Sequence, residues 1–294
     1  MLRKLLIITA GLSLGVLALG YTGRVLPLGE SLAAFRLPNI LAAAVFLLAL
    51  RKYRVFYIGL ALIILSVLSV ASVYIPQRVT GDPVYRLYQK NLLYRIQDIS
   101  DLKADMLGTQ RTDFITLQEV SDPNLMLLEQ LADDFPHQIL CSFSAVGGPA
   151  ILSRWPVIEG QTYCHYNDGI TAMKVQTPSG PLWIISIHQA WPYPYGQAAH
   201  TKRLLDRIEA LEGPKLIGGD FNMVPWSYTL KAFEKVSGTH QARPAINSFT
   251  LPYIPMTIPI DHVLVPKNSR ARAQRRGKKG SDHFGIIAEF TLPK

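Results

Sequence analysis

Long uncharged stretches fill the first 76 residues of this chain and limit what it can fold into. Leu5 to Gly23 and Val55 to Ile75 contain no charged side chain, and each is long enough as a helix to cross a hydrocarbon core of about 30 Å. A stretch between them, Leu37 to Leu50, is shorter, and it reaches spanning length only when it is extended back to Ser31, which brings in Arg36. This part of the chain is therefore predicted to be a membrane region with about three transmembrane helices.

Basic residues flank these stretches on one side of the predicted membrane. Arg3 and Lys4 precede the first stretch, and Arg51–Arg54 separates the second from the third. Since positively charged loops stay on the cytoplasmic side, three crossings would place everything after residue 76 on the outer side. The first stretch could alternatively be a signal peptide cleaved near Ala18–Gly20, which would leave the rest of the chain on the same side.

The chain is predicted to divide into two parts, 1–76 and 77–294, because the second part has the charge and proline content of an ordinary globular sequence. Apolar runs of strand length alternate there with amphipathic runs of helix length. Strands are expected at 84–94, 114–119, 138–142, 150–153, 172–175, 182–187, 215–217, 260–265 and 284–290, and helices at 96–107, 123–135 and 197–211. Such alternation is typical of an α/β fold, here predicted to be a sandwich of two sheets with helices outside.

A formal charge of +9 comes in large part from one short segment, 267–279. The segment contains no acid, and its cations are Lys267, Arg270, Arg272, Arg275, Arg276, Lys278 and Lys279. A run of this kind can be a solvated, mobile loop, or a patch that attracts the phosphate of a substrate or of anionic lipid. Both interpretations stay open, and the position just before Ser281–His283 adds weight to the second.

Two cysteines, Cys141 and Cys164, occur in the chain. Neither their spacing nor their neighbours indicate a metal site or a redox motif. They can pair if this part of the chain faces an oxidising compartment, or they can be two small buried side chains.

Polar residues stand where several of the predicted strands end. Glu119 follows the apolar run Phe114–Leu117, and Asp220 and Asn222 follow Lys215–Ile217. Asp220 and Asn222 flank Phe221 at the end of this strand, so alternation is expected to put the carboxylate and the carboxamide on the same side, where they can converge on one phosphate or water. An Asx turn that caps the strand is the plainer interpretation of the same two residues. Glu119 could likewise be a surface carboxylate after a core strand.

Histidines add proton-transfer groups at other strand ends. His188 ends the run Trp183–Ile187, Asp261 opens a further apolar run, and Asp282 and His283 precede the last predicted strand. Hard cations such as Mg²⁺ prefer carboxylate and carboxamide oxygens, and imidazole exchanges protons near neutral pH. Together with the carboxylates above, these residues predict a metal-dependent phosphoesterase.

The same residues carry a resemblance to a known family. Residues from about 84 to 290 resemble the endonuclease/exonuclease/phosphatase superfamily, which has the DNase I-like fold, and in particular its membrane-anchored bacterial branch. The matching segments are Gln89–Asn91, Leu117–Glu119, Ala150–Arg154, Ile187–His188, Gly219–Asn222, Ile260–Val263 and Ser281–His283. The resemblance implies a four-layer α/β sandwich, in which two mixed sheets pack together between outer helices. With the spans, it implies a site on the periplasmic or extracellular side of a bacterial plasma membrane.

The resemblance also implies a metal site and the group that acts on water. Glu119 would hold a Mg²⁺ or Mn²⁺ ion, with Asn91 and Asp282 contributing nearby. Asp220 would orient or deprotonate the water that attacks the phosphorus.

The remaining catalytic roles also follow from the resemblance. Asn222 and His188 would bind the scissile phosphate, and His188 matches the second catalytic histidine of the DNase I-like branch. His283 would act in general acid/base catalysis, paired to Asp261, which fixes its tautomer and stabilises the imidazolium. Two departures bear on the substrate: no acid just before Ala150 supports His188, and the compact length predicts short substrate-reading loops.

From the site and the spans together we expect a membrane-anchored, outward-facing hydrolase that acts on a phosphate ester of a phospholipid or lipid-linked substrate. Tethering would raise the effective concentration of such a substrate. A membrane-tethered nuclease with the same chemistry is the alternative, since phosphate contacts dominate nucleic-acid affinity. A non-catalytic membrane binding or sensor protein is the third hypothesis. The expected partners are the bilayer and a phosphorylated substrate, and nothing in the sequence indicates an obligate protein partner.

Overall fold

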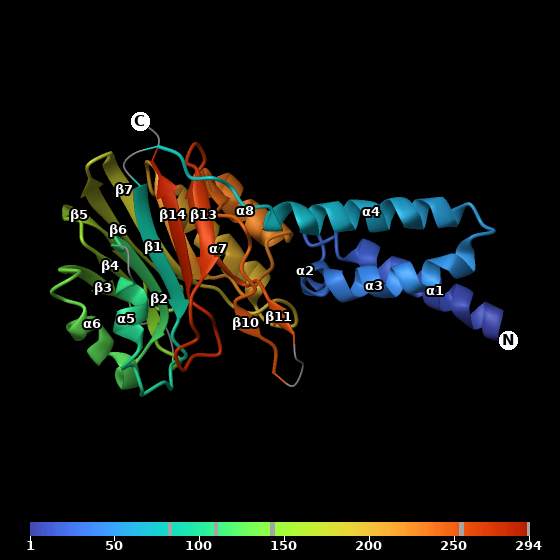
Figure 1. Cartoon of the computed structure of the whole chain (residues 1–294), viewed down its shortest axis with the longest axis horizontal. Coiled ribbons are helices and arrows are strands. Elements are labelled where there is room, and N and C mark those ends of the chain that lie inside the picture. The colour runs from blue at the N-terminus through green and yellow to red at the C-terminus, as the bar shows by residue number, and fades with distance from the viewer. Residues whose placement is uncertain (82–83, 109–110, 142–144, 253–255, 293–294) are drawn as a thin grey trace.

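A computed structural model describes the chain except for residues 82–83, 109–110, 142–144, 253–255 and 293–294. Figure 1 shows a bundle of helices extending to one side of an α/β sandwich. The N-terminus and the turn between α3 and α4 lie at the end of the bundle farthest from the sandwich. The basic residues that flank the apolar stretches, at the N-terminus and at 51–54, are therefore at this same end.

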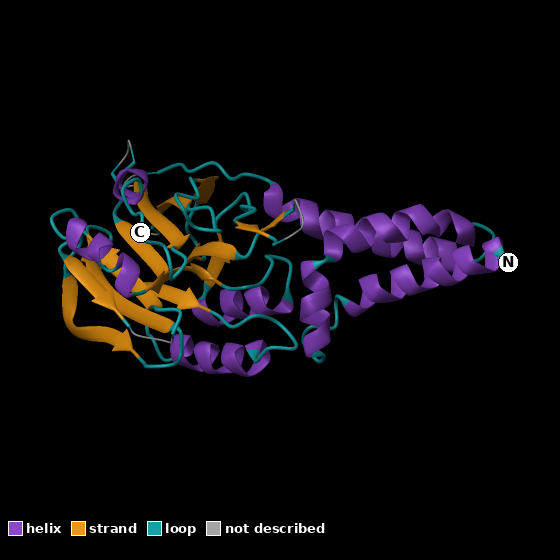
Figure 2. Cartoon of the chain, turned by 90° about the horizontal axis from the view of Figure 1, so that it is seen from below, coloured by secondary structure: helices purple, strands orange, loops and turns teal. Residues whose placement is uncertain are grey.

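The bundle is built from the apolar stretches of the sequence. Its elements are α1 (Leu2–Leu19), α2 (Pro27–Ala34), α3 (Arg36–Leu47), the 3₁₀ turn η1 (Leu48–Leu50) and α4 (Val55–Tyr74). By length and composition, α1 and α4 can each cross a membrane. The predicted second span is not straight, because α2 and the unit of α3 and η1 meet at an angle of 77°. In Figure 2, α2 lies across the ends of the longer helices, where they meet the sandwich.

The first sheet brings the ends of two parallel strands to one edge. Its strand order is β13-β14-β1-β2-β4-β3. The strands are β13 (Ala271–Arg275), β14 (Ile286–Thr291), β1 (Val84–Asn91), β2 (Phe114–Val120), β4 (Gly148–Ser153) and β3 (His137–Leu140). Because β1 and β2 run parallel, with Asn91 opposite Gln118, the side chains of Asn91 and Glu119 emerge at the same edge.

The second sheet gathers three more of the predicted site residues. Its order is β5-β6-β7-β8-β12-β9. The strands are β5 (Val157–Cys164), β6 (Ile170–Thr177), β7 (Gly180–His188), β8 (Lys215–Asp220), β12 (Asp261–Pro266) and β9 (Thr239–Gln241). In the register, His188 and Asp261 each lie opposite Asp220. A separate two-stranded ribbon joins β10 (Phe249–Thr250) to β11 (Thr257–Ile258).

Helices cover the outer faces of both sheets and confirm the predicted four-layer sandwich. The short elements α5 (Leu102–Leu107), η2 (Asp122–Asn124) and α6 (Met126–Gln130) pack on the first sheet, and α7 (Gln197–Glu209) and α8 (Tyr228–Ser237) on the second. A third apolar cluster fills the space between the sheets; it includes Leu87, Phe114, Met173, Ile184, Leu216 and Val263. Burial of these side chains holds the two sheets face to face.

Several local predictions are wrong. The helix expected at 96–107 begins only at Leu102, since Asp98 Oδ1 accepts the N–H of Ser100 and forms a turn there. The helix expected at 123–135 is shorter, comprising η2 and α6. The basic run is not a loop throughout, because five of its residues form β13. Strand β5 and helix α8 were not predicted.

Two glycines just before Asp220 allow close packing, Gly218 between the two sheets and Gly219 between neighbouring strands of one sheet. A Cβ at Gly218 would collide with Thr116 Oγ1 in the opposite sheet, and a Cβ at Gly219 with Ile187 O in the neighbouring strand. The backbone of neither glycine needs a positive φ, so the requirement is space and not conformation.

A disulfide between Cys141 and Cys164 joins the two sheets along one side of the sandwich. Cys141 follows β3 and Cys164 ends β5, which are edge strands of different sheets. Of the two interpretations of these cysteines, the structure therefore shows pairing. Bonds of this kind form and persist in oxidising compartments.

A buried carboxylate connects the helical bundle to the sandwich. Glu30 in α2 accepts the backbone N–H groups of Tyr228 and Thr229, both at 3.0 Å. These are the first two residues of α8, whose N–H groups have no partner within the helix. The helix dipole also favours a negative charge at this end.

Other contacts at this junction use main-chain oxygens. Arg36 donates to the carbonyl oxygens of Gly20 at 3.1 Å and Trp226 at 3.4 Å. The indole N–H of Trp226 donates to Ala33 O at 2.8 Å. Arg36 therefore lies at the bend before α3, and its charge contacts main-chain groups on both sides of the junction.

Candidate active site

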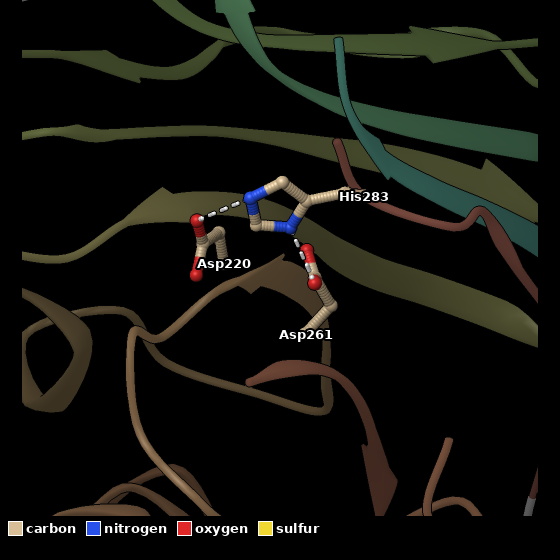
Figure 3. A group of neighbouring side chains, drawn as sticks. All are labelled: Asp220, Asp261 and His283. Carbon is tan, nitrogen blue, oxygen red and sulfur yellow. Dashed lines mark hydrogen bonds and ion pairs between the residues drawn. The ribbon is translucent and has the colours of Figure 1, made fainter. Parts of the chain in front are cut away.

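His283 lies between two buried aspartates where the two sheets meet (Figure 3). Its Nδ1 is 2.7 Å from Asp261 Oδ2, and its Nε2 is 3.8 Å from Asp220 Oδ2. The aspartates are neighbours in the register of β8 and β12, whereas His283 comes from the segment before β14 of the other sheet. The three residues therefore depend on both sheets for their arrangement.

A chain of buried amides holds Asp261. Gln89 Nε2, from the opposite sheet, donates to Asp261 Oδ1 at 3.0 Å and to Gln118 Oε1 at 2.7 Å. Gln118 in turn donates to Ser186 Oγ, and the N–H of Asp261 donates to Ser248 Oγ. Since a carboxylate only accepts, the proton of the short contact is on His283 Nδ1, and the fixed Asp261 directs Nε2 toward Asp220.

A second group of side chains joins Asp220 to the end of the first sheet. Asn91 Nδ2 donates to Glu119 Oε1 at 3.0 Å and to Asp220 Oδ2 at 3.1 Å. Glu119 Oε2 accepts the N–H of Tyr94 at 2.8 Å. His188 Nε2 lies 3.8 Å from Glu119 Oε1 and 3.9 Å from Asp220 Oδ2. Four strands, β1, β2, β7 and β8, thus direct polar groups to one place.

Asn222 reaches the site by a turn and not by strand alternation, because β8 ends at Asp220. Its N–H donates to Asp220 Oδ1 at 2.8 Å, which is an Asx-type turn. Its side-chain Nδ2 donates to Gln189 O at 2.7 Å. The amide oxygen of Asn222 is buried and has no hydrogen-bond partner among the described residues. The turn therefore places one carboxamide beside the carboxylate, with an unused acceptor.

Unusual backbone conformations occur at this site. Glu119 has a φ of 59° and Asn222 a φ of 48°, both in the left-handed region. A non-glycine residue held there costs on the order of 1–3 kcal/mol, and such strain is often found at functional sites. At Glu119 the register between β2 and β4 also shifts, so the strand is distorted where the carboxylate emerges.

Buried Lys90 fixes the segment that carries His283. Lys90 Nζ donates to His283 O at 2.9 Å and to Gly277 O at 3.2 Å. Ser281 Oγ donates to Asn91 O at 2.8 Å and accepts the N–H of His283 at 2.9 Å. The Asp282 side chain, by contrast, is 45% exposed, and its Oδ1 is 3.9 Å from His283 Nε2. Asp282 therefore lies at the rim, next to His283.

Burial and neighbouring charges separate the two histidines in their affinity for protons. Burial alone would lower the pKa of His283, but the charges of Asp261 and Asp220 raise it to about 9. Burial lowers the pKa of His188 to about 4, and the charge of His283 acts in the same direction. Near neutral pH, His283 therefore carries a proton on both ring nitrogens and His188 is neutral.

The two aspartates are also shifted in opposite directions. Burial raises the pKa of Asp220 to about 7, and the negative charge of Asp261 adds to this. Burial would raise the pKa of Asp261 too, but the charge and hydrogen bond of His283 hold it below its usual range. Asp261 and His283 thus form an ion pair beside a carboxyl group that binds its proton more tightly than usual.

Two sets of side chains offer ligands for a metal ion. Ligand atoms of Asp220, Asp261 and His283 all lie within 4.8 Å of one another. However, Asp261 and His283 already satisfy each other at 2.7 Å, which suits proton transfer better than ligation. The carboxylates of Glu119 and Asp220 share the neutral amide donor of Asn91, and a hard divalent cation would offset their charge. The oxygen donors at this end of the site therefore fit such a cation.

Sequence reasoning assigned no role to several residues that position the site. Gln89, Gln118, Ser186 and Ser248 support Asp261, and Lys90 supports His283. The available signal for Gln89, Lys90 and Gln118 was their place in the segments Gln89–Asn91 and Leu117–Glu119, which carry the family resemblance. No signal marked Ser186 or Ser248, because their partners come from distant parts of the chain.

Solved structures with this fold include three whose sequences are only distantly similar. Sphingomyelinase C from Streptomyces griseocarneus is 16% identical, with a TM-score of 0.51, and the match covers 70% of this chain and 99% of that one. A β-toxin mutant from Staphylococcus aureus with bound magnesium ions is 14% identical, with a TM-score of 0.51 and the same coverage. TDP2 from D. rerio, complexed with a single-strand DNA product, is 16% identical, with a TM-score of 0.53; 72% of this chain and 100% of that one are covered.

Sequence comparison identifies the family. No curated protein sequence matches the chain. The Endonuclease/Exonuclease/phosphatase family model matches residues 100–283, which is more than half of the chain and includes every predicted site residue except Asn91. With the sandwich fold and the site described above, the chain belongs to the endonuclease/exonuclease/phosphatase family and is an enzyme that hydrolyses phosphoester bonds.

Proposed function

We propose that this enzyme is anchored in a membrane by residues 1–76 and that residues 77–294 form an outward-facing catalytic domain that hydrolyses a phosphate ester of a membrane lipid. The observation that carries the proposal is the path of residues 189–196, which follow His188. Their Trp191 ring lies 5.6 Å from the ring of Phe249, which lies 4.8 Å from that of His283. Two residues later, Tyr193 O accepts a hydrogen bond from Ser31 in α2 at 2.7 Å. One short segment thus runs from the site to the apolar helices.

Exposed aromatic rings on this segment suit the surface of a bilayer. Trp191, Tyr193 and Tyr195 are 41%, 53% and 67% exposed. Tryptophan and tyrosine are enriched at the boundary between lipid and water, because their rings are apolar and carry a polar group. A lipid whose headgroup lies at that boundary would be within reach of the site without leaving the bilayer.

Two observations support the outward orientation. The N-terminus and the basic turn at Arg51–Arg54 lie at the far end of the bundle, which is where cytoplasmic residues are expected. The Cys141–Cys164 disulfide lies in the sandwich, at the other end, as expected for an oxidising compartment.

The proposed chemistry is in-line attack of water on phosphorus. Glu119 would hold a Mg²⁺ or Mn²⁺ ion with Asn91, and Asp282 would contribute from the rim. When bound, the ion supplies positive charge that offsets the negative charge growing on the phosphate oxygens. The sphingomyelinase and magnesium-bound β-toxin structures support a lipid phosphodiester and this ion as the first candidates to test.

The remaining roles belong to side chains of the chain itself. Asp220, whose Oδ2 faces His188 and His283, would orient the attacking water and accept its proton. Asn222 and neutral His188 would donate hydrogen bonds to the phosphate. His283 would transfer a proton through Nε2, while Asp261 holds its other nitrogen and stabilises the cationic ring.

A nuclease is the second candidate, and one observation favours it. Cations border the site on the side of His283: Lys278 donates to Thr250 Oγ1, and the charges of Lys278 and Arg275 lie over the ring of Phe284. Phosphate groups of a nucleic acid would be attracted there. The TDP2 structure with a single-strand DNA product supports testing this substrate.

The test is a substrate panel on the full-length protein in liposomes. Phospholipid headgroup release, hydrolysis of a lipid-linked phosphate and nicking of plasmid DNA are each measured with Mg²⁺, with EDTA and with Asp220→Asn. We expect turnover of a lipid substrate that EDTA and Asp220→Asn abolish, with DNA cleaved at least tenfold more slowly. Faster DNA cleavage would establish the nuclease. Turnover of lipid that survives both EDTA and Asp220→Asn would refute the proposed site.

A matched pair of variants tests the path from site to membrane. Tyr195→Ala removes an exposed ring of the segment, and Tyr166→Ala removes an equally exposed ring elsewhere on the sandwich. We expect Tyr195→Ala alone to slow hydrolysis of lipid in liposomes while both variants hydrolyse a soluble aryl phosphodiester normally. If both variants hydrolysed lipid in liposomes at the same rate, the segment 189–196 would no longer support the proposed function.

A further inference from the structure

A basic surface cavity lies where the chain leaves α4 and enters the sandwich. Its volume is about 520 Å³, and its lining residues are Gln77, Arg78, His240, Arg243, Lys267, Ser269 and Arg270. No acidic side chain is among them. None of these residues belongs to the active site described above, so the cavity is a separate feature of the molecule.

The positive charge of this cavity is not balanced by ion pairs. Among the described residues, Arg78, Arg243, Lys267 and Arg270 have no carboxylate within 4.0 Å. Arg243 Nη1 donates to Ser72 O at 3.0 Å, which uses one of its five donors. Four cations around one space repel each other, and an anion placed among them would relieve this repulsion.

A buried hydroxyl in the same lining also lacks a partner. Ser269 is 7% exposed, and its Oγ makes no hydrogen bond in the described part of the structure. Its carbonyl oxygen faces His240 Nε2 at 3.0 Å, so the residue is held in place by its main chain. A buried hydroxyl without a partner is costly, and rotation of the Ser269 side chain toward the cavity would let an oxygen of a bound ligand satisfy it.

Contacts with α4 fix the depth of the cavity relative to the proposed membrane. Arg243 binds the carbonyl of Ser72, and Ala245 N–H donates to Val73 O at 2.9 Å, both in the last turn of α4. Tyr74 ends this apolar helix, and its hydroxyl donates to Asn247 at 2.7 Å. The cavity therefore begins where the apolar span ends, which is the depth of lipid phosphate groups.

We propose that this cavity binds the phosphate headgroup of an anionic phospholipid from the outer leaflet, at a site that is not the catalytic one. The inference rests on the proposed membrane anchoring but not on the proposed reaction. A phosphate diester carries one negative charge and acceptor oxygens for the arginines and Ser269, and its acyl chains would lie along α4. Free phosphate has similar oxygens, but only a lipid is concentrated at this depth.

The test is native mass spectrometry of the full-length protein released from detergent. The probes are phosphatidylglycerol as anionic lipid, phosphatidylcholine as zwitterionic lipid and inorganic phosphate as competitor. The test variant is Lys267→Gln/Arg270→Gln, whose two exposed cations form no ion pair with the described residues. The control Lys103→Gln/Lys202→Gln removes the same charge from α5 and α7, away from the cavity.

We expect the unmodified protein to retain phosphatidylglycerol in preference to phosphatidylcholine, and excess inorganic phosphate to leave this lipid bound. Lys267→Gln/Arg270→Gln should weaken retention by roughly tenfold or more, since each cation near anionic lipid contributes to binding. The control should retain lipid as before. Equal retention by both double variants, or displacement by inorganic phosphate, would overturn the proposal. Retention of the lipid does not require turnover, so this test does not depend on whether the proposed reaction is correct.

Discussion

Two regions of this molecule that bury charged side chains, the active site and the junction between helices and sandwich, surround those charges with different kinds of groups. At the junction, Glu30 and Arg36 bind main-chain N–H and carbonyl groups. At the active site, Asp220 shares one amide donor with Glu119 and lies opposite a second aspartate in the sheet. Charges at the junction are therefore stabilised by main-chain dipoles, whereas at the active site several ionisable side chains lie close together.

The two kinds of surroundings allow different roles: charged residues at the junction position helices, and those at the active site can take part in the reaction. Main-chain dipoles cannot exchange protons, so Glu30 and Arg36 can only hold α2 and α8 in place. Side chains that face each other across 2.7 to 3.9 Å can exchange protons and hold cations. Changes at the active site should therefore alter turnover, and changes at the junction should alter stability and the use of lipid substrates.

The largest expected effect is on turnover. Asp261→Asn removes the charge that holds a proton on His283, and we expect hydrolysis of a soluble aryl phosphodiester to fall by roughly 10²–10⁴-fold. Glu30→Gln, the matched change at the junction, should leave this rate within about twofold. The comparison would fail if Asp261→Asn kept more than a tenth of the activity or if Glu30→Gln lost as much.

Protonation of histidine should act on the sandwich, since no histidine precedes His137. His262 is buried, donates to Met223 O at 2.7 Å and accepts from Gln241 at 3.0 Å; burial lowers its pKa to about 4. The unfolded chain, with a pKa near 6.5, binds this proton first. Stability from this group is therefore present above about pH 6.5 and is lost as the pH falls toward 4, by up to about 3 kcal/mol.

The measurement is the free energy of unfolding against pH for the wild type and His262→Gln. The variant is expected to be less stable at pH 7 and to lose less stability between pH 7 and pH 4. Parallel curves for the two proteins would show that His262 does not contribute.

At the junction, Glu30→Gln should lower stability by about 1–2 kcal/mol, because α8 loses the negative charge at its N-terminus. Thermal unfolding in detergent measures this loss. Glu129→Gln, an exposed change in α6, is the control and should stay within about 0.5 kcal/mol. A Glu30→Gln protein as stable as the control would mean that the carboxylate does not join the two parts.

The smallest expected effect comes from one hydrogen bond. Trp226→Phe removes the indole donor to Ala33 O, and Trp183→Phe removes a similar donor to Glu212 O within the sandwich. Each should cost about 1 kcal/mol of stability. Only Trp226→Phe should also slow hydrolysis of lipid in liposomes relative to a soluble substrate, because only it loosens the junction. An equal loss of liposome activity in Trp226→Phe and Trp183→Phe would contradict a specific role of the junction in the use of lipid.

Much of the fold followed from apolar runs in the sequence, because strands that are buried on both faces are mostly apolar. The runs before Glu119, Asp220 and His188 are strands β2, β8 and β7, and the parallel pairs place their ends at common edges. What could not be predicted depends on distant partners. Nothing near Gln89 in the sequence indicates Asp261, which is its partner across the two sheets.

The junction was also hidden from sequence reasoning. In the sequence, the charge of Arg36 counted against a second membrane span. In the structure, Arg36 lies at the bend between α2 and α3 and contacts main-chain oxygens. The basic segment 267–279 was interpreted as a candidate loop. It contains one short strand, in which buried Ala271 and Ala273 alternate with exposed Arg272, and this pattern is too short to be recognised in the sequence. An alternating pattern of this length is weak evidence for a strand, and the seven cations of the segment favoured the loop.

The glycines before Asp220 determine how this site can vary. A side chain at Gly218 would press on Thr116 and force the sheets apart, and Asn91 would then move away from Asp220. The tolerance of this position to mutation is thus set by a strand of the other sheet and not by the reaction. Substitution even by alanine at Gly218 is expected to impair the enzyme although no catalytic group is touched, and a compensating Thr116→Ala change, which removes the colliding hydroxyl, would be the natural place to look for its recovery.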